Sequence, residues 1–268
     1  MINRRLIFHF YASNDWKSNP IYYVHKYFLT RYSHIFTEAT FIISVNDTDD
    51  IDLINEVKSF LIECKFKTIE FRVEKNCELY EVDTFEKYIL NRLNDLDGST
   101  FFGHSKGTMD YYVHNKNAIL LWITMLYFLN LEYYKEAENR FYSCSSYFFG
   151  GPMLCNVLKI SNGFLYSGTF YWLNCLRIYK NFKDSIPKIY DRFYAENFPG
   201  SLCLKDNYEA CSHNYKMIGQ DSGEPFLFFK EGNPEFAISI LLDEDEQKNF
   251  YSVVEDLKQF LSDNKITY

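Results

Sequence analysis

The stretch Gly98-Ser-Thr-Phe-Phe-Gly-His-Ser-Lys-Gly-Thr108 changes abruptly from apolar to small, cationic and hydroxyl residues. A short apolar run that ends in a glycine-bounded polar cluster is typical of a central strand in an α/β sheet, so we expect a strand over residues 99–102. Ligands of such sheets bind at the carboxyl ends of the strands. The sequence therefore predicts that the polar cluster at residues 104–106 faces a crevice, with a glycine on either side to let the backbone turn.

Two chemical interpretations of this cluster compete with an ordinary strand-to-loop turn. As Gly103-x-Ser105-x-Gly107, the segment matches the nucleophile elbow of α/β-hydrolases, in which Ser105 would attack a carbonyl. As His104-Ser105-Lys106-Gly107, it offers two potential cations, a hydroxyl and backbone N–H groups. That set would suit the phosphates of a nucleotide-activated substrate.

The residues before this cluster alternate between strand and helix patterns. Strand-like runs occur at residues 4–11, 40–45 and 67–73. They alternate with helix-like runs at residues 20–35, 51–61 and 85–93. Such alternation predicts an α/β fold with a mainly parallel central sheet and helices on both faces. No linker or repeat divides the 268 residues, so we expect a single domain.

Beyond the cluster, the patterns are mainly helical. A polar and aromatic segment, 109–116, precedes a long helix expected over residues 117–139. Further helices are expected at 186–197 and at 244–262, the last packing on the sheet as support. A hydrolase elbow would start its helix at the serine, so the delayed helix disfavours that interpretation.

Composition narrows the functional classes. The formal net charge of −8 and the pI near 5.3 argue against a non-specific nucleic-acid binder. Seven cysteines without a CxxC pair favour reduced thiols in the cytoplasm and disfavour a zinc site. The apolar run at 120–129 is far shorter than the ~20 residues that cross a bilayer. We therefore expect a soluble, cytoplasmic protein with no nucleic-acid partner.

An acidic turn follows the second expected strand. Asp47 and Asp49 form an Asp-x-Asp pair, which can hold a divalent cation through oxygen ligands. Aspartates at the start of a helix also cap N–H groups and complement the helix dipole. Capping and contact with a nucleotide base or ribose both stay open.

Three segments further along the chain form a recognisable series. They are Phe102-Gly-His-Ser-Lys-Gly107 with the Trp122 helix after it, Tyr166-Ser-Gly-Thr-Phe-Tyr-Trp172, and Arg192-Phe-Tyr-Ala-Glu-Asn-Phe-Pro-Gly200. The series resembles the "HSKG … SGNFWW … E" arrangement of a group of GT-A-like glycosyltransferases associated with surface polysaccharide synthesis. The resemblance implies a nucleotide-sugar-binding half over residues 1–110, an acceptor and catalytic half over 111–215, and a supporting segment over 216–268.

The resemblance also implies roles for individual residues, in transfer of a sugar from a nucleotide-sugar donor to a polysaccharide or glycolipid acceptor. Glu196 would be the catalytic base that takes the proton of the acceptor hydroxyl. The donor-binding residues would be Tyr11, Ala12, Asp47, Asp49, His104, Ser105, Lys106, Gly107 and His213. The acceptor-binding residues would be Ser167, Gly168, Tyr171 and Trp172, with core packing as the competing role of the tryptophan.

The sequence departs from the family pattern in one respect. GT-A enzymes usually place a metal-binding Asp-x-Asp after the central strand, and here His104-Ser-Lys106 occupies that place. Lys106, with His104 or the N–H groups of the turn, would neutralise the leaving diphosphate without an ion. A divalent metal such as Mn or Mg is compatible with the sequence but not implied by it. Peripheral contact with a membrane is a further expectation for a glycolipid acceptor.

Two other functional classes stay open. An α/β-hydrolase-type esterase would use Ser105 as nucleophile, Asp184 or Asp191 as orienting group and His213 as base, in the chain order of that fold. A non-catalytic protein would bind a nucleotide or a glycan without turnover.

Overall fold

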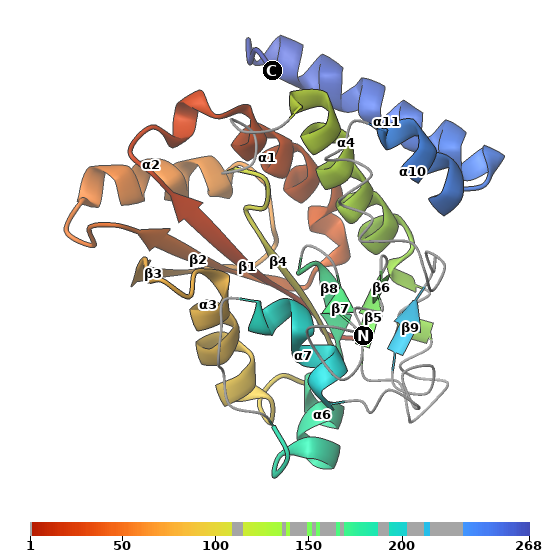
Figure 1. Cartoon of the computed structure of the whole chain (residues 1–268). Coiled ribbons are helices and arrows are strands. Elements are labelled where there is room, and N and C mark those ends of the chain that lie inside the picture. The colour runs from red at the N-terminus through yellow and green to blue at the C-terminus, as the bar shows by residue number, and fades with distance from the viewer. Residues whose placement is uncertain are drawn as a thin grey trace.

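The computed structural model is a layered α/β structure (Figure 1). It describes residues 2–108, 115–135, 138–139, 149–151, 154–155, 165–166, 169–186, 193–202, 212–214 and 233–268. The first strands are β1 (Arg4–Ala12), β2 (Glu38–Val45), β3 (Ile69–Lys75) and β4 (Ser99–His104). The helices between them are α1 (Pro20–Tyr32), α2 (Ile51–Ile62) and α3 (Glu81–Tyr88).

The second half of the described chain adds shorter elements. Its helices are α4 (Lys116–Tyr127), which continues as the π-turn η5 (Phe128–Glu132), α6 (Cys175–Phe182), α7 (Tyr194–Leu202), α10 (Pro234–Leu241) and α11 (Glu244–Asp263). Its strands are β5 (Phe149–Gly151), β8 (Tyr171–Leu173) and β9 (Ser212–Asn214), with a separate pair formed by β6 (Leu154–Cys155) and β7 (Leu165–Tyr166).

One sheet organises the described residues. Its strand order is β3-β2-β1-β4-β8-β5-β9. The strands β3, β2, β1 and β4 are parallel to one another, whereas β8 runs antiparallel to both of its neighbours, β4 and β5. The prediction of an α/β fold with a mainly parallel sheet is confirmed.

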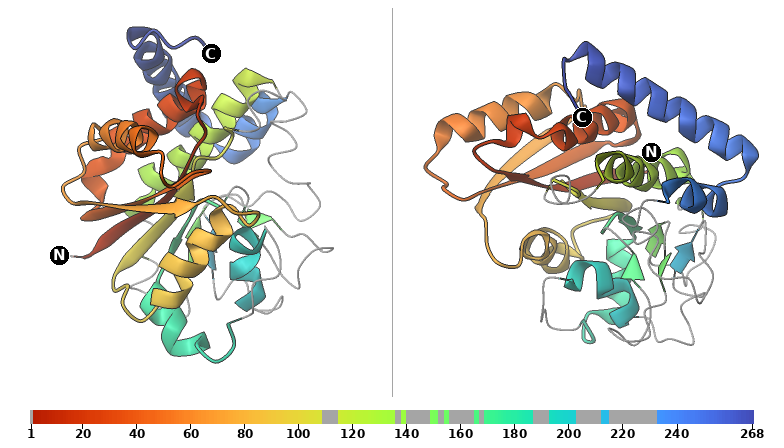
Figure 2. Two further views of the ribbon diagram at one scale, coloured as in Figure 1. Left: turned by 90° about the vertical axis from the view of Figure 1, so that its left-hand side faces the viewer. Right: turned by 45° about the horizontal axis from the view of Figure 1, so that its top comes forward.

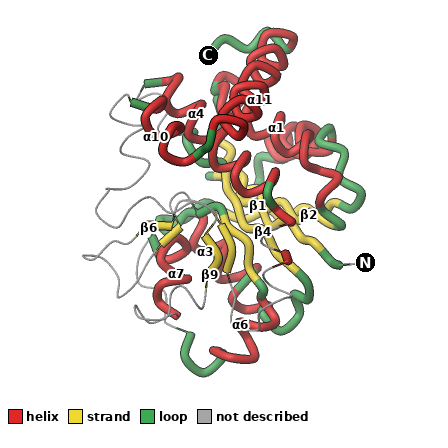
Figure 3. Tube along the Cα trace, turned by 90° about the vertical axis from the view of Figure 1, so that its right-hand side faces the viewer, coloured by secondary structure: helices red, strands yellow, loops and turns green. Residues whose placement is uncertain are grey.

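Helices cover both faces of the sheet. α1, α2, α4, α10 and α11 lie on one face, and α3, α6 and α7 on the other (Figures 2 and 3). Successive residues of β1 serve both layers, since Phe8 packs in the first core and Ile7 in the second. A strand covered on both faces is apolar throughout, which explains the continuous apolar run of β1.

The expected helices differ from the observed ones in their bounds and packing. The helix predicted over 85–93 is α-helical over Glu81–Tyr88, and a 3-10 turn follows at Leu90–Arg92. The helix predicted over 117–139 is interrupted: α4 ends at Tyr127, the π-turn follows to Glu132, and residues 134–135 and 138–139 are α-helical again. The described part of the helix predicted over 186–197 begins at Tyr194 instead and continues to Leu202, while residues 187–192 lie outside the described residues. α11 lies outside α1 and α4, so it supports the helical layer and not the sheet directly (Figure 1).

Two helices were missed although their start signals are present in the sequence. The side chain of Asn174 accepts a hydrogen bond from the N–H of Arg177 and caps α6. Asn233 caps α10 in the same way, with Pro234 at the first helical position. Asparagine before a helix and proline at its start are the residues preferred there.

The connections define a switch point in the sheet. From β1 the chain proceeds to β2 and β3 on one side, whereas β4 pairs with β1 on the other side. Ligands of open α/β sheets bind outside the carboxyl ends of the strands at such a point. His9 and His104 are paired in the β1–β4 ladder, so the polar cluster that follows β4 lies at this position.

Tyr171 and Trp172 are core residues of β8. The Trp172 ring is 1% exposed, stacks on Phe36 with ring centroids 5.8 Å apart, and donates from Nε1 to the carbonyl of Asn130 at 3.1 Å. Tyr171 is 0% exposed, and its hydroxyl donates to the carbonyl of Ala195 at 2.6 Å. Neither ring offers a face to a sugar, so the acceptor-stacking interpretation is replaced by core packing.

Trp172→Ala tests this assignment. Loss of a buried tryptophan should lower the free energy of unfolding by about 3 to 5 kcal/mol. Tyr251→Ala, which removes an exposed aromatic ring on α11, should cost less than about 1 kcal/mol. Urea denaturation measures both variants. Equal small costs would contradict the core assignment.

Candidate functional site

Ser105 ties the end of β4 to β1. Its Oγ accepts a hydrogen bond from the N–H of Tyr11 at 3.0 Å, and its own N–H donates to the carbonyl of His9 at 2.9 Å. The residue is buried. These contacts describe a structural anchor, and the next described helix begins only at Lys116, which is not the geometry of a nucleophile elbow.

The hydrolase constellation is not assembled by the sheet. His213 is paired with Gly150, Gly150 with Trp172, and Trp172 with Phe101, so the His213 backbone lies level with the middle of β4. β9 is three strands from β4, which corresponds to about 14 Å. That separation is too large for a direct bond between His213 and Ser105, and it also keeps His213 away from the end of β4.

Helix α1 holds the loop that carries Lys106. Asn19, the N-cap of α1, donates from Nδ2 to the carbonyl of Thr108 at 2.8 Å. The Thr108 hydroxyl donates to the carbonyl of Ser105 at 3.0 Å. His25, nearly two turns further along α1, lies 2.9 Å from the carbonyl of Lys106 through its Nε2. The carbonyl groups of Ser105, Lys106 and Thr108 therefore all have side-chain donors.

The protonation of His25 follows from its two partners. A carbonyl oxygen only accepts, so Nε2 carries the hydrogen that is donated to Lys106. Nδ1 is then the acceptor for the hydroxyl of Tyr127, 2.8 Å away. Burial lowers the pKa of His25 to about 3, so the ring is neutral at physiological pH.

Lys106 and Glu196 meet between the two helical layers. Lys106 Nζ lies 3.6 Å from Glu196 Oε1, and 5.3 Å from the centre of the Trp122 ring. Trp122 belongs to α4 on one face of the sheet, and Glu196 to the first turn of α7 on the other. The two side chains are 23% and 17% exposed, so the ion pair is accessible to solvent and to a ligand. Glu196 was expected at the end of a helix and lies at its start.

Gly107 allows the close approach of this loop to α4. Its φ is +84°, and a Cβ atom at this position would lie 2.6 Å from Ile123 Cδ1. A side chain would therefore meet both an unfavourable backbone conformation and a clash. His104, the remaining member of the cluster, is buried with its ring 5.8 Å from that of Phe170.

The donor-side residues on β1 and β2 have structural contacts of their own. The carbonyl of Tyr11 accepts from the hydroxyl of Tyr22 at 2.6 Å, and Ala12 is buried. Asp47 accepts from the N–H of Asp49 at 3.0 Å, and both side chains are exposed. Asp50, next along the turn, caps α2 through Leu53 N–H, so capping accounts for part of the acidic turn.

The hydrogen bonds that hold the loop from α1 are not predicted by the sequence. Asn19 and Pro20 are a helix-start signal, but nothing in the sequence shows that the Asn19 amide also reaches Thr108. His25 lies at the spacing of the apolar residues Ile21 and Phe28, and a histidine at a core position was a usable signal. Ser167 and Gly168 lie outside the described residues, as does the side chain of His213.

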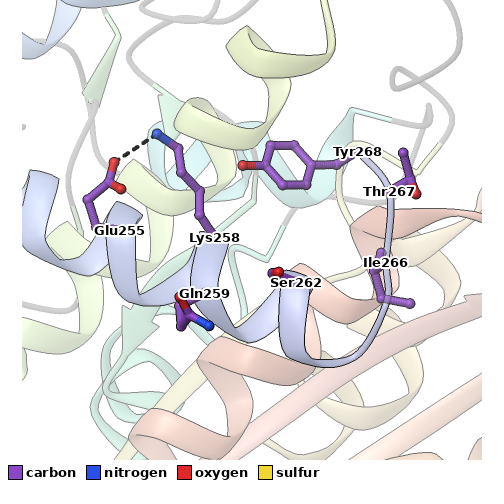
Figure 4. Close-up of a pocket in the computed structure, with 7 residues that line it drawn as sticks. All are labelled: Glu255, Lys258, Gln259, Ser262, Ile266, Thr267 and Tyr268. Carbon is purple, nitrogen blue, oxygen red and sulfur yellow. Dashed lines mark hydrogen bonds and ion pairs between the residues drawn. The ribbon is translucent and has the colours of Figure 1, made fainter.

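Other features of the described residues do not compete with this site. A hollow of about 520 Å³ lies along the end of α11, lined in part by Glu255, Lys258 and Tyr268 (Figure 4). A second, of about 560 Å³, lies between α1 and α2. Neither contains a candidate residue. Within the described ranges no group of three His, Cys, Asp or Glu side chains could hold a metal ion, and no helix there has the length and apolarity to cross a membrane.

Gly107→Ala should destabilise the protein by about 1 to 3 kcal/mol, because alanine is strained at a positive φ and its Cβ meets Ile123. Ile123→Val, which removes Cδ1, should recover part of that cost in the double variant. Gly103→Ala is the matched control, since its Cβ would have only ordinary contacts at 3.4 Å. Thermal and urea denaturation measure the series, and a double variant no better than Gly107→Ala would contradict the steric explanation.

Acid should destabilise the protein through its buried histidines. Burial lowers the pKa of His9 to about 4 and that of His25 to about 3, from an ordinary value of 6.5. Below pH 6.5 these histidines bind protons in the unfolded chain but not in the folded chain, so the free energy of unfolding decreases as the pH is lowered. At pH 5, each histidine should cost about 2 kcal/mol.

Urea denaturation at pH 7 and pH 5 checks this pH dependence, with His25→Gln beside the wild type. Glutamine does not titrate, so the variant should lose about 2 kcal/mol less than the wild type over this interval. Equal losses in the two proteins would contradict a neutral, buried His25.

Comparison with known proteins identifies no relative of this chain. No protein-family model matches the sequence, and no curated protein shows significant similarity to it. The inference of function therefore starts from the switch point of the sheet and the groups gathered there.

Proposed function

We propose that this protein is a glycosyltransferase that moves a sugar from a nucleotide-sugar donor to a polysaccharide or glycolipid acceptor. The observation that carries the proposal is the pairing of Lys106 with Glu196, 3.6 Å apart at the switch point of the sheet. Transfer with inversion needs a carboxylate to take the proton of the acceptor hydroxyl, and positive charge to stabilise the departing diphosphate. These two groups come from distant segments of the chain and lie together.

The fold supports the same proposal. The strands of the main sheet, numbered along the chain without the β6–β7 pair, have the order 3-2-1-4-6-5-7 with only the sixth reversed among those described. In this proposal the parallel part binds the nucleotide, and the mixed part, with β8 and α7, binds the acceptor. This division into halves is the one that a GT-A-like fold implies.

Each residue of the pair has one chemical role in the proposed reaction. The acceptor oxygen attacks the anomeric carbon while its proton passes to Glu196. The bond between that carbon and the diphosphate oxygen breaks, and its electron pair leaves with the diphosphate. The Lys106 ammonium neutralises the charge that develops there. Trp122 contributes a cation–π contact that holds the ammonium in this position.

The observed ion pair gives an order to these events. While Lys106 is paired with Glu196, the ammonium lies against the Oε1 atom of the carboxylate, where the acceptor hydroxyl would have to donate. A donor diphosphate offers Lys106 more negative charge than one carboxylate does, so donor binding would draw the ammonium away. Glu196 would then be available to the acceptor. Donor binding before acceptor activation is part of the proposal.

The experiment is a binding and turnover screen with UDP-, GDP-, CMP- and dTDP-sugars, with and without Mn²⁺. Thermal shift identifies the donor class, because a ligand of the native state raises stability by mass action. Lys106→Ala should weaken donor binding by about 10- to 100-fold, the value of a charged hydrogen bond. Release of the nucleoside phosphate or diphosphate measures turnover.

Glu196→Gln separates the two roles. It should lower turnover by about 100-fold or more as a base is lost. It should also tighten donor binding by about twofold to fivefold, since Lys106 loses a competing partner. Glu255→Gln removes an exposed carboxylate of α11 that is paired with Lys258, as a control outside the site, and neither effect is expected from it. Labelling of Ser105 by a fluorophosphonate, without any nucleotide binding, would overturn the proposal in favour of a hydrolase.

A further inference from the structure

The peptide bond between Lys106 and Gly107 is held in a defined orientation. Its carbonyl accepts from His25 Nε2 at 2.9 Å, toward the core. In a trans peptide the C=O and N–H bonds point in opposite directions, and the described residues contain no cis peptide. The N–H of Gly107 therefore points away from His25.

The N–H group of Gly107 is a hydrogen-bond donor that a ligand could use. Gly107 N–H makes no hydrogen bond to any atom of the described residues, although its neighbours Ser105 and Lys106 both donate from their backbone nitrogens. It belongs to the residue that directly follows Lys106, whose ammonium supplies the positive charge of the site. Backbone N–H groups at left-handed turns beside a cation form favourable anion-binding positions.

His25 is unusual for a core residue because its position costs free energy. It is 0% exposed, with its ring edge against Phe8 and Tyr127. A polar ring in the core is tolerated when both nitrogens have partners, and here the partners are the Tyr127 hydroxyl and the Lys106 carbonyl. An apolar residue would fill this place at lower cost, so the bond to the loop is what histidine adds.

We infer that His25 is a positioning residue of the anion site: its bond to the Lys106 carbonyl aims the Gly107 N–H, beside the Lys106 ammonium, at a phosphate oxygen of a diphosphate. Tyr127 contributes by holding the His25 tautomer that donates from Nε2. The inference rests on the proposed function for the diphosphate, and adds to it a buried residue that touches no substrate.

The experiment uses inorganic pyrophosphate and UDP as probes, with affinity measured by calorimetry on the full chain. His25→Leu keeps an apolar core but leaves the Lys106 carbonyl without its donor, and should weaken binding of both probes by about tenfold or more. His25→Gln retains an amide N–H for the carbonyl and an acceptor for Tyr127, so its affinity should stay within about threefold of the wild type. Rescue by glutamine is a result that loss of packing alone would not give.

A control on the same helix separates positioning from stability. Leu29→Ala opens the core of α1 away from the loop, and should lower the unfolding free energy without changing affinity for pyrophosphate. The amide signal of ¹⁵N-labelled Gly107 gives an independent readout. Pyrophosphate should shift it in the wild type and in His25→Gln, and not in His25→Leu.

The outcomes are distinct. If His25→Leu binds as the wild type does, if glutamine fails to rescue, or if Leu29→Ala loses as much affinity as His25→Leu, the inference is wrong while the proposed function stands. If pyrophosphate binding depends on His25 but no nucleotide sugar is turned over, the proposed function is wrong and the inference holds. If the wild type binds neither probe, the inference is wrong, and the proposed function is decided by the screen with the other nucleotide sugars.

Discussion

The parallel pairing of β1 with β4 is the constraint on which the rest of the site depends. The chain uses one side of β1 for β2 and β3, so β4 has only the other side, and its carboxyl end emerges at the switch point. The loop that follows must turn between two helical layers. Lys106 therefore has Trp122 of one layer on one side, and Glu196 of the other layer on the other. A cation at the meeting of the layers follows from the topology.

Buried polar groups then fix the loop. A carbonyl group that turns into the core loses its water, and the cost is offset only by a protein donor. Asn19 and His25 supply two such donors from α1, and Tyr127 supplies the hydrogen bond that completes the second. The same burial that fixes the loop also keeps His25 neutral, since desolvation disfavours its charged form. Orientation of the loop and protonation of the histidine are consequences of one environment.

The sequence predicts the parts of this arrangement that depend on local patterns. The strands around Phe8 and Phe101 follow from continuous apolar runs bounded by polar turns, and the position of Lys106 follows from the rule for strand ends. Contacts across the fold have no such signature. The rings of Tyr171 and Trp172 resemble ligand-stacking residues until α7 and the π-turn after α4 cover them. Likewise, the spacing of His25 shows a polar residue on a core face, but its partner lies 81 residues away in sequence.

The Lys106–Glu196 ion pair differs from the buried contacts in how little it adds to stability. A partly exposed pair adds little stability, because water screens it and two long side chains lose freedom. Lys106 and Glu196 thus attract each other weakly, while Trp122 and the hydrogen-bonded backbone of the loop hold the lysine in place. A weak pair on a rigid loop can exchange partners without moving the loop. For the proposed transferase this matters, because a diphosphate can replace the carboxylate at Lys106 at little cost, and the carboxylate it releases is the base that the next step requires.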